Sequence, residues 1–223
     1  FLRKAAGTAR EEQPVAANVD ILFLCMALNN DFNLRRLERY LAAAWNSGAT
    51  PVVVLTKADL CGNPSEKVAA VEEAAPGTDV LLTSAAQEDG IRPLLPYLTP
   101  GRTVAFVGSS GVGKSTLMNG LLGKEILATG GLRNDDRGRH TTTRRQMFFL
   151  PGGAALIDTP GMRELGLWDS ESGLETAFAD IEALARQCRF RDCRHEKEPG
   201  CAVRAALASG ELSEERFRSW QRL

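Results

Sequence analysis

The 223-residue sequence has almost no net charge and no long apolar segment. Lysine and arginine together number 27 against 28 aspartates and glutamates, which gives a formal net charge of −1. This balance excludes a globally cationic nucleic-acid binder but leaves room for local basic patches. The longest apolar run, residues 21–28, is far too short to span a bilayer. The first residues lack a start methionine and the apolar core of a signal peptide, so we expect a fragment of a longer protein. We also expect a cytoplasmic location, a monomer and no membrane partner.

Apolar, β-branched-rich runs alternate with amphipathic stretches, which is the pattern of βα units around a mostly parallel sheet. The predicted fold class is therefore α/β. Strands are expected at residues 20–26, 51–55, 79–82, 103–107, 146–150 and 154–157, and helices at 34–44, 66–75, 90–98 and 114–122. The residues PGG between the last two strands indicate a hairpin turn. After Gly166 the pattern changes to helix, a cysteine-rich segment and helix again, so we place a domain boundary near Asp169.

A glycine-rich segment follows the strand expected at residues 103–107. Gly108, Gly113, Lys114 and Ser115 match G-x-x-x-x-G-K-[ST], in which backbone N–H groups surround phosphates, lysine neutralises charge and the hydroxyl binds Mg²⁺. The helix that follows directs its positive end at the same anion. We interpret the segment as a nucleoside triphosphate loop; a ligand-free glycine and serine turn is the alternative. The expected contacts are Gly108, Ser109, Ser110, Gly111, Val112, Gly113, Lys114, Ser115 and Thr116.

Two further segments favour guanine as the base. VVVLTKADL places Thr56, Lys57, Ala58 and Asp59 directly after a buried strand, where open α/β sheets have their ligand contacts. An aspartate there can accept both N1–H and N2–H₂ of guanine, a pair that adenine lacks, and a lysine stem can cover the base. In the later LLTSAA, the backbone N–H groups of Ser84 and Ala85 would lie near guanine O6. A surface turn is the alternative for the Lys-Ala-Asp segment alone.

The residues DTPG follow the apolar strand AALI and suggest a switch. Asp158 would hold Mg²⁺ through water, and the Gly161 N–H would sense the γ-phosphate. The long polar, glycine-rich segment before this strand is typical of a loop that only bound triphosphate and Mg²⁺ order. Thr142 or Thr143 is the expected metal-sensing hydroxyl; the alternative is that the threonines simply begin the next strand.

A cysteine-rich segment near the C-terminus has the spacing C-x₄-C-x-H-x₅-C. Its Cys188, Cys193, His195 and Cys201 would form a closed tetrahedral zinc site with a structural role, because no position remains for a catalytic water. Disulfides are the alternative, which a cytoplasmic setting disfavours. Of the other two cysteines, Cys25 lies in an apolar strand and Cys61 in a loop without a partner that argues for reactivity.

The order TKAD, TSA, GSSGVGKS, RHTTT, DTPG resembles that of circularly permuted GTPases, in which the base-reading segments precede the phosphate loop. With the Cys/His segment, the chain resembles the RsgA (YjeQ) family of small ribosomal subunit biogenesis GTPases. The resemblance implies binding to a late precursor of that subunit and its rRNA, subunit-stimulated GTP hydrolysis and release. It also implies an upstream OB-fold domain, of which residues 1–18 would be a remnant or linker, followed by a GTPase domain at 19–169 and a helical zinc-binding domain at 170–223. Thr56 replaces the asparagine of many members, which would weaken one loop hydrogen bond and leave the Asp59 contact intact.

Basic residues cluster in two places, which suits the phosphate backbone of RNA, although a solvated surface is the alternative. One cluster surrounds the cysteines (Arg186, Arg189, Arg191, Arg194, Lys197) and the other lies in the polar loop (Arg133, Arg137, Arg139, Arg144, Arg145). Phe190 lies among the first group and would stack on a base or plug the small lobe.

His140, in the polar loop, is the candidate catalytic residue. Met162, not a water-orienting glutamine, follows Gly161, so we expect slow intrinsic hydrolysis. His140 would orient the attacking water once the loop closes, and the family resemblance points to a histidine in this Arg-His-Thr-Thr-Thr segment. An ordinary surface histidine is the alternative. A P-loop kinase and a non-catalytic RNA-binding zinc module are the rival functional classes.

Overall fold

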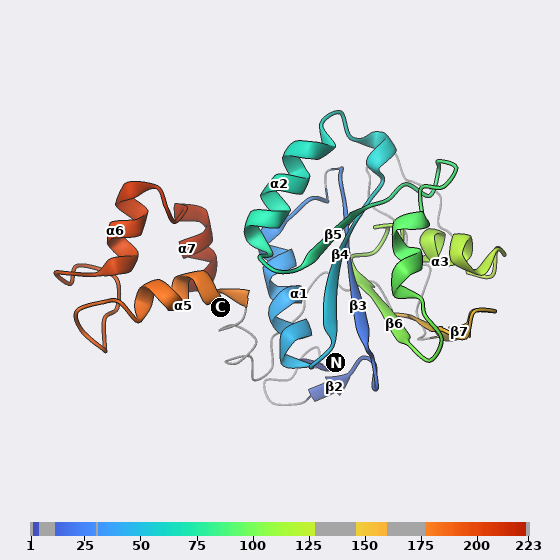
Figure 1. Cartoon of the computed structure of the whole chain (residues 1–223), viewed down its shortest axis with the longest axis horizontal. Coiled ribbons are helices and arrows are strands. Elements are labelled where there is room, and N and C mark those ends of the chain that lie inside the picture. The colour runs from blue at the N-terminus through green and yellow to red at the C-terminus, as the bar shows by residue number, and fades with distance from the viewer. Residues whose placement is uncertain (1, 5–11, 30, 128–145, 160–176, 222–223) are drawn as a thin grey trace.

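The computed structural model describes residues 2–4, 12–29, 31–127, 146–159 and 177–221. Its centre is a six-stranded sheet with the order β5-β4-β3-β6-β8-β7 (Figure 1). The strands are β3 (Ile21–Ala27), β4 (Thr50–Thr56), β5 (Asp79–Leu82), β6 (Thr103–Gly108), β7 (Gln146–Phe149) and β8 (Ala155–Asp158). All neighbours pair in parallel except β7 and β8, which pair antiparallel. The expected mostly parallel α/β sheet and the hairpin at PGG are therefore confirmed.

Helices cover both faces of this sheet because its central strands are apolar on both sides. On β3, Leu22, Leu24 and Met26 belong to one hydrophobic cluster, and Phe23 and Cys25 belong to the other. The first cluster lies beneath α1 (Leu34–Asn46) and α2 (Pro64–Ala74), and the second beneath α3 (Lys114–Leu122). This arrangement leaves the carboxyl ends of the parallel strands on one edge of the sheet, which is where such folds bind ligands.

The helix expected at residues 90–98 takes a tighter form in the structure. Residues 90–98 were expected to form a helix, and the structure has a shorter helix there, η2 (Arg92–Tyr97), which is a 3₁₀ helix rather than an α-helix. Pro93 and Pro96 account for the difference, because neither has a backbone N–H and an internal proline clashes with the preceding helical turn. A second 3₁₀ helix, η1 (Ala58–Leu60), follows β4.

The N-terminal residues contribute a separate two-stranded antiparallel sheet, β1 (Leu2–Lys4) and β2 (Glu12–Pro14). Val15, which directly follows β2, is buried in the cluster beneath α1. Within the described ranges, none of the helices has the length and apolar character needed to span a bilayer.

A helical lobe formed by α5 (Ala179–Ala185), α6 (Ala202–Ser209) and α7 (Glu214–Gln221) lies beside α1 (Figure 1). Its contact with the sheet domain centres on Arg216 of α7, whose side chain is only 7% exposed. The guanidinium donates to both Asp180 oxygens at 2.7 and 2.8 Å, and to Glu38 Oε1 of α1 at 3.2 Å. It also donates to the carbonyls of Ala74 and Ala177, at 3.3 and 2.9 Å.

Glu38 is buried with this guanidinium and also accepts a hydrogen bond from the Ser219 hydroxyl. Burial raises the pKa of Glu38, and Ser219 and Arg216 oppose that shift. A buried carboxylate deprived of its cation is costly, so the arginine and the glutamate depend on each other.

We expect Arg216→Ala to lower the free energy of unfolding by about 3 kcal/mol, because the substitution leaves Glu38 buried without its charged partner. Arg218→Ala is the matched control on the same helix, since Arg218 pairs with Glu214 at 3.5 Å with both side chains exposed. Its expected loss is below about 0.5 kcal/mol. Denaturant unfolding of the two variants measures the difference, and equal losses would contradict the assigned role of the buried cluster.

Candidate functional site

The phosphate loop connects β6 to α3, as expected, and its glycines are required by the backbone. Gly111 and Gly113 have φ of 77° and 109°, which side chains rarely adopt. At Gly108 an added Cβ would lie 2.5 Å from the Cys25 carbonyl oxygen of the neighbouring strand. The loop therefore packs directly against β3.

Lys114 begins α3, and its side chain folds back over the loop. Its Nζ donates to the carbonyl oxygens of Gly108 and Ser109, each at 2.9 Å. Burial lowers the pKa of Lys114, while the neighbouring Cys25, Asp158 and Asp31 oppose that shift. Ser115 and Thr116 follow in the first turn of α3, half-buried and exposed respectively. The ammonium group and the first N–H groups of the helix thus lie together at one end of the loop, where they favour an anion.

The segment TKAD contacts this loop directly, through Thr56 and Val112, which lie 56 positions apart in sequence. The hydroxyl of Thr56, at the end of β4, donates to the Val112 carbonyl at 2.5 Å. Thr56 is 2% exposed, and a Cβ added at Gly113 would lie 3.8 Å from its side chain. From the replacement of asparagine by Thr56 we expected one loop hydrogen bond to be weakened. In the structure the Thr56 hydroxyl itself donates a hydrogen bond to the loop.

The segment TSA contacts the TKAD segment through a hydrogen bond to Asp59. The Ser84 hydroxyl donates to Asp59 Oδ1 at 2.6 Å, and the Ala58 N–H donates to the Thr83 carbonyl at 3.1 Å. Lys57 adopts a left-handed conformation with φ of 59°, which turns the chain sharply between the strand and η1. Asp59 and Ala85 are exposed, while Ser84 is buried.

Gly90 supports this arrangement and was not singled out from the sequence. Its carbonyl accepts a hydrogen bond from the Ser84 N–H at 3.0 Å. A Cβ at Gly90 would lie 1.9 Å from the Ser84 carbonyl oxygen, so any side chain must displace the TSA segment. Nothing in the local sequence marks this glycine, because the close approach results from how the turn after β5 folds back.

Asp158 ends β8 and is fully buried at the same edge of the sheet. It lies near enough to Lys114 and Cys25 to affect the pKa of both groups. The next residue, Thr159, donates its hydroxyl to the Phe106 carbonyl of β6. The other expected switch residues, Gly161, Thr142 and Thr143, and the expected catalytic residue His140 lie outside the described residues.

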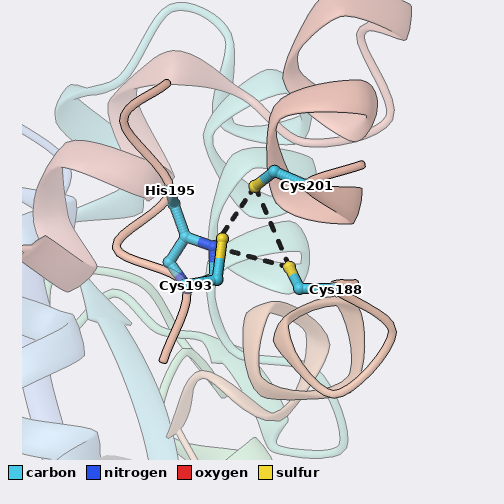
Figure 2. Close-up of side chains that lie close together, drawn as sticks. All are labelled: Cys188, Cys193, His195 and Cys201. Carbon is cyan, nitrogen blue, oxygen red and sulfur yellow. Dashed lines mark hydrogen bonds between the residues drawn. The ribbon is translucent and has the colours of Figure 1, made fainter. Parts of the chain in front are cut away.

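The four residues of the Cys/His segment converge in the C-terminal lobe. Figure 2 shows the side chains of Cys188, Cys193, His195 and Cys201 facing one another, and their ligand atoms all lie within 4.8 Å of one another. Cys201 is the N-cap of α6, and its sulfur accepts from the Arg204 N–H at 3.4 Å. Burial alone would raise the pKa of the Cys188 thiol, but its pKa is below the ordinary value because the backbone N–H groups of Val203 and Ala202 and the neighbouring thiols favour the thiolate.

The spacing of these atoms fits a tetrahedral ion. Zinc–ligand bonds of ordinary length hold two sulfurs about 3.8 Å apart and a sulfur and a nitrogen about 3.5 Å apart. The Cys188 and Cys201 sulfurs are 3.8 Å apart, and His195 Nδ1 lies 3.6 and 3.3 Å from them. These sulfurs are much farther apart than a disulfide bond allows, and every cysteine of the chain is free.

The basic residues around the cysteines are all exposed (Arg186, Arg189, Arg191, Arg194, Lys197). Phe190 is 41% exposed, and the Arg189 guanidinium lies 5.6 Å from the centre of its ring. Glu198 holds this loop by accepting hydrogen bonds from the backbone N–H groups of Arg194, Glu196 and Lys197. The second basic group expected from the sequence (Arg133, Arg137, Arg139, Arg144, Arg145) lies outside the described residues.

Comparison with known proteins identifies the family. The family model described as RsgA GTPase matches residues 1–168. The chain belongs to the RsgA GTPase family. The family resemblance seen in the sequence is therefore confirmed.

Curated relatives match nearly the whole chain. The "Small ribosomal subunit biogenesis GTPase RsgA 2" of Lactiplantibacillus plantarum is 55% identical over 223 residues, which are 100% of this chain and 63% of the relative. The "Small ribosomal subunit biogenesis GTPase RsgA" of Methanosarcina acetivorans is 52% identical, covering 99% of this chain and 60% of the relative. The chain thus spans less than two thirds of the length of these relatives.

Two solved structures share the fold. YjeQ from Thermotoga maritima is 31% identical with a TM-score of 0.68, and the match covers 92% of this chain and 70% of that one. YloQ, described as a circularly permuted GTPase, is 28% identical with a TM-score of 0.65, covering 92% and 67%. The fold is accordingly that of a circularly permuted GTPase of the RsgA family, followed by a C-terminal region whose Cys₃His cluster fits a zinc-binding lobe.

Proposed function

We propose that this chain binds GTP and Mg²⁺ and hydrolyses the nucleotide. The observation that carries the proposal is the Thr56–Val112 hydrogen bond, which holds the TKAD segment against the phosphate loop at 2.5 Å. Two segments that separately suit a base and a phosphate chain therefore face one space at the carboxyl edge of the sheet. Membership in a GTPase family supports the same conclusion.

In this proposal each part of the site has a distinct role. The loop residues from Gly108 to Gly113 and the first turn of α3 surround the phosphates, Lys114 neutralises them, and Ser115 binds Mg²⁺. Thr116 adds a further contact at the start of α3. Asp158 holds the Mg²⁺ through water.

At the other end of the site, Asp59 pairs with the N1–H and N2–H₂ groups of guanine. The stem of Lys57 covers the base, and Ala58 holds the turn that presents both side chains. Ser84 and Ala85 direct backbone N–H groups toward guanine O6. The Ser84–Asp59 hydrogen bond of 2.6 Å supports this arrangement, because it holds the two base-reading segments together.

Asp59→Asn tests the choice of base. The amide can no longer accept both guanine protons, so we expect GTP affinity to fall by about 100-fold or more. Affinity for xanthosine triphosphate should rise, because its second carbonyl accepts a hydrogen bond that asparagine can donate. Fluorescence titration with GTP, xanthosine triphosphate and ATP measures the three affinities.

The matched control is Asp89→Asn, which removes a neighbouring exposed aspartate paired with Arg92 at 3.3 Å. This variant should bind GTP like the unsubstituted chain. Preference of the unsubstituted chain for ATP would contradict the proposal and favour a P-loop kinase.

We further propose that the chain acts in late maturation of the small ribosomal subunit, with hydrolysis stimulated by the subunit and coupled to release. The relatives named as small ribosomal subunit biogenesis GTPases support this role, as does the exposed basic surface around the cysteines, which suits rRNA. Thr142 or Thr143 and Gly161 would sense the metal and the γ-phosphate, and His140 would orient the attacking water. In this view the protein is a cytoplasmic monomer.

The proposed division of the chain follows from this role. Residues 1–18 belong to an upstream OB-fold domain or its linker, 19–169 form the GTPase domain and 170–223 form the zinc-binding domain.

His140→Ala tests the catalytic assignment. Under single-turnover conditions with purified small subunits, we expect phosphate release to slow by about 100-fold, because a positioned general base contributes at least that much. GTP affinity should stay unchanged, which separates chemistry from binding. Unchanged phosphate release together with unchanged affinity would remove the proposed role of His140.

We also propose that the Cys₃His cluster holds one structural zinc ion. The sulfur and nitrogen spacings given above support the assignment, as does the donor set, which leaves no open position for a water. The ion would join the loop carrying Cys193 and His195 to the start of α6, so binding energy becomes folding energy of this lobe.

Metal analysis tests the zinc assignment. The purified chain should contain about one zinc ion per molecule, and Cys201→Ser should lose it. Cys61→Ser is the matched control, because this cysteine lies outside the cluster, and it should retain the metal. A chain that folds without zinc, or a Cys201→Ser variant that retains it in full, would contradict the proposal.

A further inference from the structure

Asp31 lies beside the phosphate loop although it belongs to a different part of the chain. It follows β3 and precedes α1, and β3 pairs with β6 so that Cys25 stands opposite Gly108. Both strands end at the same edge of the sheet, which brings the segment after β3 next to Ser109. There the Ser109 hydroxyl donates to Asp31 Oδ2.

Ser109 in turn holds the lysine of the loop. Its backbone carbonyl accepts a hydrogen bond from Lys114 Nζ at 2.9 Å, while its side chain is held by Asp31. Ser109 is 1% exposed, so its hydroxyl has little access to water as an alternative partner. The position of the lysine ammonium therefore depends on a residue that Asp31 keeps in place.

The charge of Asp31 is balanced by α1. Arg36 Nη2 lies 3.0 Å from Asp31 Oδ2, and the Arg36 side chain is only 12% exposed. A bare carboxylate beside a phosphate site would repel the ligand, and the guanidinium offsets that repulsion. The same carboxylate remains a strong acceptor for the Ser109 hydroxyl, because hydrogen bonds to ionised groups are the strong ones.

We propose that Asp31 is a positioning residue of the nucleotide site, which fixes Ser109 so that Lys114 is placed for the phosphates before the nucleotide arrives. The inference rests on the proposed function, because it assigns a role toward the phosphates of the same GTP. Preorganised contacts bind more tightly because ordering is not required at the moment of binding.

If Asp31 only stabilised the start of α1, any change that weakens this helix start would lower nucleotide affinity to the same extent. The N-cap of this helix is Asn33, whose side chain accepts from the Arg36 N–H at 2.9 Å. Asn33→Ala thus weakens the helix start without removing the contact to Ser109. Loss of a cap lowers the stability of the helix and of the fold. It should leave nucleotide affinity close to that of the unsubstituted chain.

The test is a double-mutant cycle on Asp31→Ala and Ser109→Ala in the full chain. We expect each single variant to weaken GDP and GTP binding by about tenfold, since each removes one hydrogen bond to a charged group. The double variant should be no weaker than either single one, because both remove the same contact. Asp31→Asn should recover part of the affinity, because it still offers an oxygen to the Ser109 hydroxyl.

Calorimetric titration with GDP and GTP measures the affinity of each variant. Denaturant unfolding of each nucleotide-free variant measures its stability. Normal affinity in Asp31→Ala would overturn the inference, and so would losses that multiply in the double variant. An equal loss of nucleotide affinity in Asn33→Ala and Asp31→Ala would show that Asp31 acts only by stabilising the start of α1, which would overturn the inference. If Asp31→Ala does not fold, Ser109→Ala decides the question from the other side of the contact. Absence of any guanine-nucleotide binding by the unsubstituted chain would instead refute the proposed function.

Discussion

The hydrogen bond between the Thr56 hydroxyl and the Val112 carbonyl is the contact on which the proposed nucleotide site depends. It joins the last residue of β4 to the loop after β6, and β3 lies between these strands in the sheet. A parallel sheet makes this possible because all its strands end at one edge, whatever their order along the chain. The permuted order therefore changes how the TKAD, TSA and phosphate-loop segments are connected along the chain. It does not change the edge of the sheet at which they lie. The hydrogen bond from Ser84 to Asp59 adds the segment after β5 to the same edge, because β5 pairs with β4.

The helix α1 contacts both the site and the C-terminal lobe. Near its start, Arg36 pairs with Asp31 beside the phosphate loop, and two residues later Glu38 is buried with Arg216 of α7. In the lobe, the ring centres of His195 and Trp220 lie 5.4 Å apart, so α7 also packs against the Cys₃His cluster. One helix and one buried ion pair thus place the Cys₃His cluster on the face of the sheet opposite α3.

The strands and their edge were predictable because their signals are local. The segments that form β3, β4 and β6 are continuous apolar runs, so these strands are apolar on both faces. The glycines of the phosphate loop have a recognisable spacing. The cluster of Cys188, Cys193, His195 and Cys201 was predictable for the same reason, since its spacing suits tetrahedral coordination. The roles of residues outside the described ranges, among them His140, remain predictions from the sequence.

Contacts that depend on tertiary packing were not predictable. Gly90 is required by the carbonyl of Ser84, six positions earlier, and Arg216 by a glutamate on α1. Asp31 has an ordinary place before a helix, and only the parallel pairing of β3 with β6 brings it to Ser109. The expectation of a helix at residues 90–98 did not specify its 3₁₀ form, which Pro93 and Pro96 explain.

The most direct measurement is a crystal structure of this chain with Mg²⁺ and a non-hydrolysable GTP analogue. We expect one nucleotide to span the edge of the sheet, with the guanine edge on the Asp59 carboxylate and the β- and γ-phosphates at Lys114. A nucleotide whose base lies away from Asp59 while its phosphates occupy the loop would contradict the single-site interpretation, and so would binding of the phosphates elsewhere.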